Sequence, residues 1–174
     1  MPNLTPETTI TYEVYNEGQR LIGTVEAELP NLQALTQSVK GAGIAGEVDS
    51  PVLGHFQDTT MKLTFRTVTP DIATILSQQY HHIELWAAVQ YLNVETGKFE
   101  VGQQKVITRA MPKAYNLGKF AVGELQGTEM EFTLNYIRVL YKGDELYELD
   151  KYNGKFTVGN TNMLADVWRA IGLT

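Results

Sequence analysis

The 174-residue chain contains no cysteine, which excludes disulfide bonds and thiolate catalysis and weakens any zinc-site hypothesis. Histidine is scarce as well: the three histidines are His55, His81 and His82. The last two are neighbours, and neighbouring residues of a strand point to opposite faces, so they cannot readily bind one metal ion. We therefore expect neither a metal site nor a bound cofactor.

Long apolar runs and a basic surplus are also missing. No apolar run approaches the length that spans a bilayer, and the opening residues, MPNLTPETT, lack the basic end and the apolar run of a signal peptide. The chain has 14 Lys and Arg against 20 Asp and Glu, which gives a formal net charge of −6. An acidic surface repels nucleic-acid phosphates on average. We expect a protein without a membrane segment, made in a cytoplasm, that does not bind nucleic acid unspecifically.

The motifs of common hydrolases and nucleotide-binding enzymes are absent, because the sequence has no G-x-S-x-G, no H-E-x-x-H and no P-loop. Glu129 and Glu131 share one face of an extended stretch and could be imagined as a hydrolase pair. Thr133 and Asn135 continue that face, so a solvated polar strand face is the better interpretation. We expect no enzymatic activity.

The segment KGAGIAGEVDS matches the spacing G-x-G-x-x-G through Gly41, Gly43 and Gly46. A dinucleotide-binding loop of this form needs a helix directly after it, because the amide groups at the helix N-terminus bind the pyrophosphate. Pro51 and Gly54 break any helix in the residues that follow. The glycines therefore indicate a flexible or sharply turned surface loop rather than a phosphate site.

Most of the chain alternates apolar and polar residues with period two, which is typical of half-buried strands. Glycine-containing turns join several of these stretches into hairpins. The expected strands are Thr9–Tyr15, Arg20–Leu29, a weaker Leu32–Val39, Thr60–Val68, His81–Val94, Phe99–Met111, Thr128–Tyr141 and Leu146–Val158. In the most regular stretch, Met130, Phe132, Leu134 and Tyr136 oppose the polar residues. The fold class is mainly β (α+β), an antiparallel barrel or sandwich of about seven to nine strands in one domain.

Two short helices interrupt the strand pattern. Thr69 is the expected N-cap of the first helix, with Pro70 at its first position, and its apolar stripe runs to about Gln79. Asn162 is the expected N-cap of a C-terminal helix, and Gly172 follows the last helical residue. The apolar face of this second helix consists of Leu164, Val167, Trp168 and Ile171. We expect that face to pack on the chain's own sheet or on a neighbouring subunit.

Three parts of the chain, in order, resemble the major tail tube proteins of contractile-tail bacteriophages. VYNEGQRLIGTVEAELPNL resembles the opening hairpin of that family, and VKGAGIAGEVDSPVLGHFQDTTMKLTFRT resembles its glycine-rich segment and the strand that follows. YIRVLYKGDELYELDKYN and LADVWRAIGL resemble its closing hairpin and terminal helix. The resemblance covers nearly the whole chain and is weakest between residues 98 and 128. It extends to the tube proteins of type VI secretion and of R-type bacteriocins.

The resemblance implies a structural subunit rather than an enzyme. In this family six copies form a ring, and rings stack into a hollow tube that a contractile sheath drives through the target cell envelope. The implied partners are further copies of the chain, the sheath protein, and the baseplate and tail-terminator proteins. The tube would be assembled in the bacterial host cytoplasm and belong to a virion tail or a bacteriocin particle. DNA would pass through a phage tube without specific binding, whereas ions would leak through a bacteriocin tube.

The resemblance also suggests where the subunits meet. Residues 1–174 would form a single tail tube domain with a glycine-rich loop around residues 40–59. Gly41, Gly43 and Gly46 would allow this loop to change shape when the next ring docks, and the contact would then order it.

The lumen of such a tube requires a polar strand face. The first candidate face consists of Glu129, Glu131, Thr133 and Asn135. Gln104 and Thr108 form a second candidate, and the alternative is that these faces meet the sheath or solvent. Two other functions stay open: the tube of a type VI-like secretion system, and a β-sandwich module that binds carbohydrate.

Overall fold

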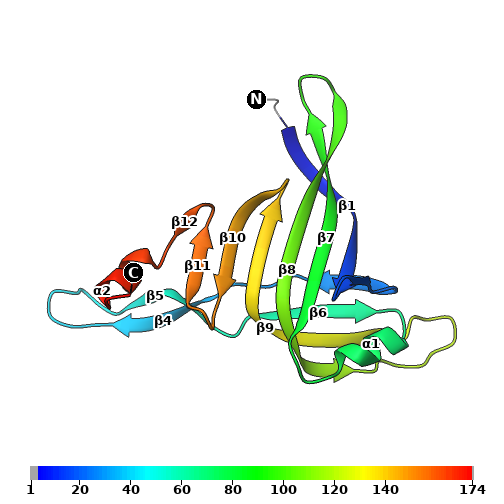
Figure 1. The fold of residues 1–174 in the computed structure, drawn as a ribbon, viewed down its shortest axis with the longest axis horizontal. Coiled ribbons are helices and arrows are strands. Elements are labelled where there is room, and N and C mark those ends of the chain that lie inside the picture. Colours follow the sequence, from blue (N-terminus) through cyan, green and yellow to red (C-terminus); the bar gives the residue numbers. More distant parts are fainter. Residues whose placement is uncertain (1–3, 174) are drawn as a thin grey trace.

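The computed structural model describes residues 4–173, and within them the chain forms twelve strands and two short helices (Figure 1). The strands are β1 (Leu4–Asn16), β2 (Gln19–Arg20), β3 (Thr24–Glu28), β4 (Ala34–Val39), β5 (Val48–Phe56), β6 (Thr60–Phe65), β7 (His81–Asn93), β8 (Lys98–Asn116), β9 (Thr128–Tyr141), β10 (Asp144–Asp150), β11 (Lys155–Val158) and β12 (Thr161–Asn162). The helices are α1 (Pro70–Ile75) and α2 (Ala165–Ala170). The predicted class, mainly antiparallel β with an internal and a C-terminal helix, is confirmed.

Strand β9 organises the sheet because it changes partner halfway along. One side of β9 pairs with β8, whereas the other side pairs with β6 over Thr128–Thr133 and with β10 over Tyr136–Tyr141. Register shifts in the β8–β9 ladder accompany this change, and bulges of this kind bend a strand. The sheet thereby forms two arms that cross in Figure 1. We call β3, β6, the first half of β9 and residues 111–116 of β8 the lower arm, and the rest of this sheet the upright arm.

The hydrophobic core lies between the two arms. In β6 the side chains of Met61, Leu63 and Phe65 are buried, while the residues between them face outward. Strands β7 and β9 alternate in the same way over much of their length, β1 contributes Val14, and α1 closes one end of the core with two isoleucines. The other buried apolar residues of these elements are Val14, Ile72, Ile75, Ile83, Leu85, Tyr91, Met130, Phe132, Leu134, Ile137 and Val139. Each large apolar side chain buried in this way contributes about 1.5–3 kcal/mol of transfer free energy.

The order of the strands decides between the two predicted architectures, a barrel and a sandwich. The hydrogen-bonded path through the main sheet runs β12-β11-β10-β9-β8-β7-β1-β2, with β6 and β3 attached beside β9. Because this path has two ends, residues 4–173 form a sheet folded over its own core and not a closed barrel. The strand number is also higher than predicted, partly because β4 and β5 form a separate two-stranded sheet.

Helix α1 is shorter than predicted. Pro70 occupies the expected first position, but the helix ends at Ile75 instead of near Gln79, and the Thr69 side chain makes no capping hydrogen bond. The Ser77 hydroxyl donates to the backbone carbonyl of Thr74, and a hydroxyl bonded in this way competes with the helical ladder. The chain then turns into β7.

Helix α2 begins later than predicted but ends as expected. Its N-cap is Leu164, and the predicted cap Asn162 instead accepts a hydrogen bond from the Leu164 amide through Oδ1. Gly172 has φ +79°; its amide donates to the Arg169 carbonyl, and the next amide donates to the Trp168 carbonyl. These two bonds are a Schellman motif, in which glycine takes the left-handed conformation that ends a helix. The predicted apolar face splits, because Leu164 is buried and Trp168 half-buried, whereas the other two residues are exposed.

Candidate assembly surfaces

Both outer edges of the lower arm are free among residues 4–173. Strand β3 pairs only with β6. Residues 111–116 of β8 pair only with β9, because β7 begins at His81, opposite Ala110. Every pairing in the lower arm is antiparallel, so β3 and β8 run in opposite directions at its two edges. A free edge offers unpaired amide and carbonyl groups to another strand.

The outer face of the lower arm brings together three of the four predicted lumen residues. Lys62 Nζ lies 3.0 Å from Glu129 Oε1, and Lys113 Nζ lies 3.7 Å from Glu131 Oε1. Thr133 Oγ1 donates to Asp58 at 2.5 Å, and Lys113 approaches the same carboxylate at 2.8 Å. The hydrogen bond from Lys113, followed by that from Thr133, lowers the pKa of Asp58.

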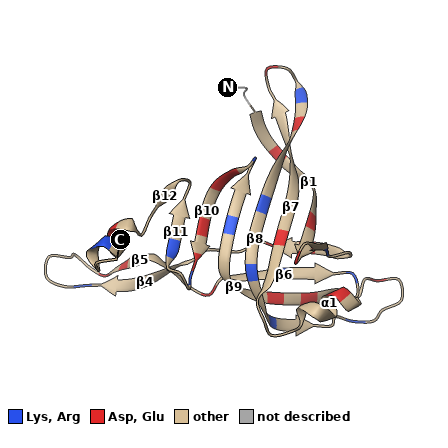
Figure 2. Ribbon diagram, in the orientation of Figure 1, with Lys and Arg blue, Asp and Glu red and all other residues tan. Residues whose placement is uncertain are grey.

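Carboxylates outnumber ammonium groups on this outer face. In register with Lys62 and Thr64, β3 adds Glu26 and Glu28 to the same side. The face therefore holds five carboxylates against two ammonium groups, a net charge of −3. The carboxylates are those of Glu26, Glu28, Asp58, Glu129 and Glu131, and the ammonium groups are those of Lys62 and Lys113. Figure 2 shows the red segments of β9 along this arm.

The fourth predicted lumen residue, Asn135, does not belong to this face. In the ladder Ala110 is opposite Leu134 and Arg109 is opposite Tyr136, so Asn135 is an extra residue at the bend. Its Oδ1 is buried without a hydrogen-bond partner. An inserted residue exchanges the inward-facing and outward-facing positions of the strand beyond it. Tyr136, which was predicted on the core face, therefore lies on the outer face, where its ring centre is 4.9 Å from the Arg109 guanidinium.

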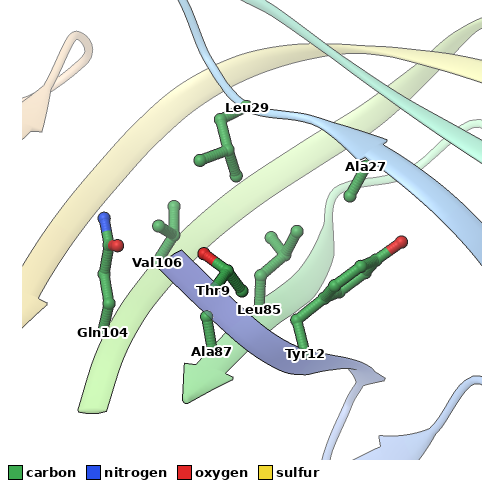
Figure 3. A pocket seen from close by; sticks show the side chains of 8 residues that line it. All are labelled: Thr9, Tyr12, Ala27, Leu29, Leu85, Ala87, Gln104 and Val106. Atoms are coloured by element: carbon green, nitrogen blue, oxygen red, sulfur yellow. The ribbon is translucent and has the colours of Figure 1, made fainter. Parts of the chain in front are cut away.

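The second predicted lumen pair, Gln104 and Thr108, does not lie on the polar exterior. Thr108 is fully buried, and its hydroxyl donates to the Ile83 carbonyl at 3.0 Å. Gln104 is half-buried at the rim of a mainly apolar cavity of about 270 Å³ (Figure 3). This cavity lies between the end of β3 and the upright arm and is lined by Thr9, Tyr12, Ala27, Leu29, Leu85, Ala87, Gln104 and Val106. Both residues thus face the inside of the fold rather than its polar exterior.

The outer face of the upright arm carries ion pairs between strands, four of them joining neighbouring strands and one, Arg109–Asp150, reaching from β8 across β9 to β10. Glu84 accepts hydrogen bonds from Lys105 at 2.9 Å, from Trp86 Nε1 at 2.8 Å and from His82 at 2.8 Å. Burial by itself raises the pKa of Glu84, but these hydrogen bonds together lower it to about 2. The other pairs are Arg20–Glu13, Arg109–Asp150, Arg138–Glu145 and Lys155–Glu148. Within these pairs five carboxylates and five basic groups balance, and Glu7, whose Oε2 accepts from Gln90, adds one further carboxylate. This face is therefore closer to neutral than that of the lower arm.

The three glycines of the G-x-G-x-x-G segment lie at the tip of the β4–β5 hairpin, at the left in Figure 1. No helix follows them, as predicted. The predicted loop around residues 40–59 is wrong in extent, because residues 48–56 form β5 and the irregular part covers 40–47. Gly43 has φ +91°, a conformation that favours glycine.

The β4–β5 hairpin stands apart from the main sheet and exposes several apolar side chains. An isolated two-stranded hairpin is at best marginally stable in water. Its base is held by the C-terminal region: the Phe56 and Phe156 rings are 5.0 Å apart, and a Cβ on Gly54 would lie 2.4 Å from Leu164 Cδ2. The exposed apolar residues of the hairpin are Leu35, Val39, Ile44, Val48 and Leu53.

Catalytic and membrane features are not evident in these surfaces. Residues 4–173 contain no group of three His, Asp or Glu side chains placed to hold a metal ion. None of the helices in that part of the chain has the length and apolar character needed to cross a membrane.

Comparison with known proteins gives a family and a fold. The family model described as "Phage tail tube protein FII" matches residues 6–172, and that description names a structural protein rather than an enzyme. No curated protein matches the chain. Among solved structures, the sheath/tube terminator of the extracellular contractile injection system PVC, in its extended state, is similar with a TM-score of 0.51 and 15% identity, covering 79% of this chain and 96% of the terminator.

A second similar structure comes from the PVC sheath–tube complex in its extended state, with a TM-score of 0.45 and 16% identity. The match covers 76% of this chain and 88% of that one.

Proposed function

Because the chain belongs to the family of phage tail tube protein FII, we propose that six copies close into a ring and that the rings stack into the hollow inner tube of a contractile tail. A sheath around this tube drives it through the envelope of the target cell. The other partners are the baseplate and the tail terminator. The tube is assembled in the host cytoplasm, and it carries DNA in a phage or leaks ions in a bacteriocin.

The pair of free edges on the lower arm is the observation that carries the proposal. A β3 strand from a second copy, placed beside residues 111–116 of β8, runs antiparallel to them and continues the sheet. The contact joins two different edges, so each copy binds one neighbour through β3 and the other neighbour through β8. Head-to-tail contacts of this kind close into rings when the rotation between copies allows it. A ring closed in this way leaves neither edge of the lower arm exposed.

The lumen in this proposal is the outer face of the lower arm. Joined edge to edge, six lower arms form a continuous sheet around a channel, and Glu129, Glu131 and Thr133 face it. The net charge of −3 on this face of each copy repels the DNA backbone. DNA therefore slides through the channel without adhering. The near-neutral face of the upright arm is turned away from the channel, toward the sheath.

The β4–β5 hairpin is the proposed contact between stacked rings. It projects from the body of the domain, and its apolar side chains are exposed in a single copy. Burial of these side chains against the next ring stabilises a hairpin that is marginal alone. Gly43 at its tip takes a backbone conformation that other residues adopt only at a cost.

Electron microscopy of the purified chain, with its mass in solution recorded alongside, tests the proposal. We expect hollow tubes or six-fold rings, either in fresh protein or after concentration. Nucleation of a ring is costly, so pre-formed baseplate–tube seeds provide the second arm of the test. A chain that remains monomeric and also fails to extend such seeds would overturn the proposed function.

A further inference from the structure

The connection between β8 and β9 carries the most exposed apolar side chains of the described chain. Phe120 is 93% exposed and Val122 is fully exposed, at the tip of the loop formed by residues 117–127. Leu117 and Leu125 near its two ends are more than half exposed as well. Apolar groups concentrated on one protruding loop are typical of an interaction site rather than of ordinary surface.

This loop has a defined shape. The Gln126 side chain accepts hydrogen bonds from Thr67 Oγ1 and the Val68 amide, and it donates to the Leu117 carbonyl at 2.8 Å. The backbone of Gln126 pairs with Arg66 on one side and Lys119 on the other. A loop fixed in this way loses little conformational entropy when it binds, so its exposed tip is a preformed anchor.

The loop lies at one end of the lower arm, next to the proposed joint between copies. It begins where the free edge of β8 ends, opposite the start of β9. The start of β3, opposite Phe65, is at the same end of the arm. Ile22, which precedes β3, is 70% exposed, and the two segments lie toward the same side in Figure 1.

Charge on the two edges is complementary. The edge of β8 carries the exposed lysine Lys113, whereas β3 carries the exposed carboxylates Glu26 and Glu28. Lys119 of the loop lies 2.8 Å from Glu124 of the same loop, so this pair adds no net charge. Opposite charges on two surfaces favour their encounter and fix their register.

We propose that residues 117–127 form an apolar knob that docks on a second copy of this chain, where Phe120 and Val122 cover Ile22 at the start of the partner's β3. This inference rests on the proposed ring, whose edge-to-edge joint brings the β8–β9 loop of one copy to that end of the next. The knob then anchors the joint beside the backbone hydrogen bonds, and Lys113 faces the two carboxylates across it.

Cysteine cross-linking tests the contact cleanly because the natural chain has no cysteine. A chain with Phe120→Cys and Ile22→Cys is assembled and treated with a short bis-maleimide. We expect a ladder of covalent multimers on a denaturing gel. Each single variant should stay monomeric, because a head-to-tail contact pairs the two different positions. The matched control combines Phe120→Cys with Phe99→Cys on the β7–β8 hairpin and should give no ladder.

The cross-linking outcomes separate the knob from the tube. Tubes that form without a ladder would overturn the knob and leave the proposed function standing, whereas the absence of tubes and rings from the unmodified chain and from seeds would overturn both. A dimer from Phe120→Cys alone would indicate a two-fold contact and contradict the inference.

Removal of the anchor gives an independent readout. The double variant Phe120→Ser, Val122→Ser should unfold at the same temperature as the unmodified single copy, because its two side chains are exposed there. We expect the concentration needed for assembly to rise at least tenfold. Val101→Ser, an exposed apolar position on the upright arm, is the control and should assemble normally. Unchanged assembly of the double variant, or an equal loss in the control, would overturn the knob.

Discussion

Replacement of Glu84 by glutamine should make the protein's stability less dependent on pH. Glu84 accepts hydrogen bonds from Lys105, Trp86 and His82, which lower its pKa from an ordinary value of 4.5 to about 2 despite its partial burial. A carboxyl group with a lowered folded-state pKa stabilises the fold above its unfolded pKa. That stabilisation is lost as the pH falls from about 4.5 toward 2.

The expected size of the effect follows from the difference between the two pKa values. A tenfold change in acidity corresponds to about 1.36 kcal/mol, so the unscreened contribution of Glu84 at neutral pH is about 3 kcal/mol. Solvent screens charges on an open sheet face, and we therefore expect about 1–2 kcal/mol. Glu84→Gln should lower the free energy of unfolding by this amount at pH 7 and by almost nothing near pH 2.

Urea unfolding of single copies, followed by circular dichroism at several pH values, measures this difference. Glu95→Gln in the exposed β7–β8 turn removes a carboxylate of the same type and serves as the control. Its stability should follow that of the unmodified protein at every pH. An equal loss for Glu84→Gln at pH 7 and near pH 2 would refute the reasoning, because the loss would then come from packing and not from ionisation.

Three other substitutions test separate parts of the structure. Gly54→Ala places a Cβ 2.4 Å from Leu164 Cδ2 at φ +70°. It should lower the free energy of unfolding by about 1–3 kcal/mol more than Gly18→Ala, because Gly18 has a similar φ of +79° but open space around it. Equal thermal unfolding of the two variants would contradict the packing of α2. Gly43→Val should leave a single copy folded, because the strained residue lies at the tip of the hairpin, but should prevent tubes in electron micrographs; normal tubes would exclude the hairpin as the contact between rings. Phe132→Ala should lower the free energy of unfolding by about 3–5 kcal/mol, as measured in urea, and a loss below about 1 kcal/mol would contradict its place in the core.

The sequence predicted the strands well wherever one face is buried. Thr60–Val68 and His81–Val94 alternate apolar and polar residues, and β6 and β7 form there. The second strand of the isolated hairpin, β5, was missed because Pro51 and Gly54 weaken a strand pattern. Proline is tolerated there because β5 pairs with β4 alone and is an edge strand.

The candidate site shows where pattern reasoning stops. Glu129, Glu131 and Thr133 share a face because they alternate in one strand, and the structure places them together. Asn135 was assigned to the same face because the bulge was not recognised. The sequence does contain a sign of the bulge. Before it the apolar residues of β9 stand at even-numbered positions, whereas after it Ile137 and Val139 stand at odd-numbered positions.

The alternation of apolar and polar residues does not predict contacts between strands that are distant in sequence. The lysine partners of the acidic lower-arm face come from β6 and β8, and their positions depend on strand register. The outer face of the upright arm depends on register in the same way, because its five ion pairs join residues of different strands.

The continuity of β8 and β9 through both arms has a mechanical consequence. The two strands remain hydrogen-bonded from the upright arm, through the bend, to the end of the lower arm. A force that slides one of these strands along the other loads many hydrogen bonds in parallel, whereas a peeling force would break them one after another. The joint between the arms is therefore stiff against shear between these two strands.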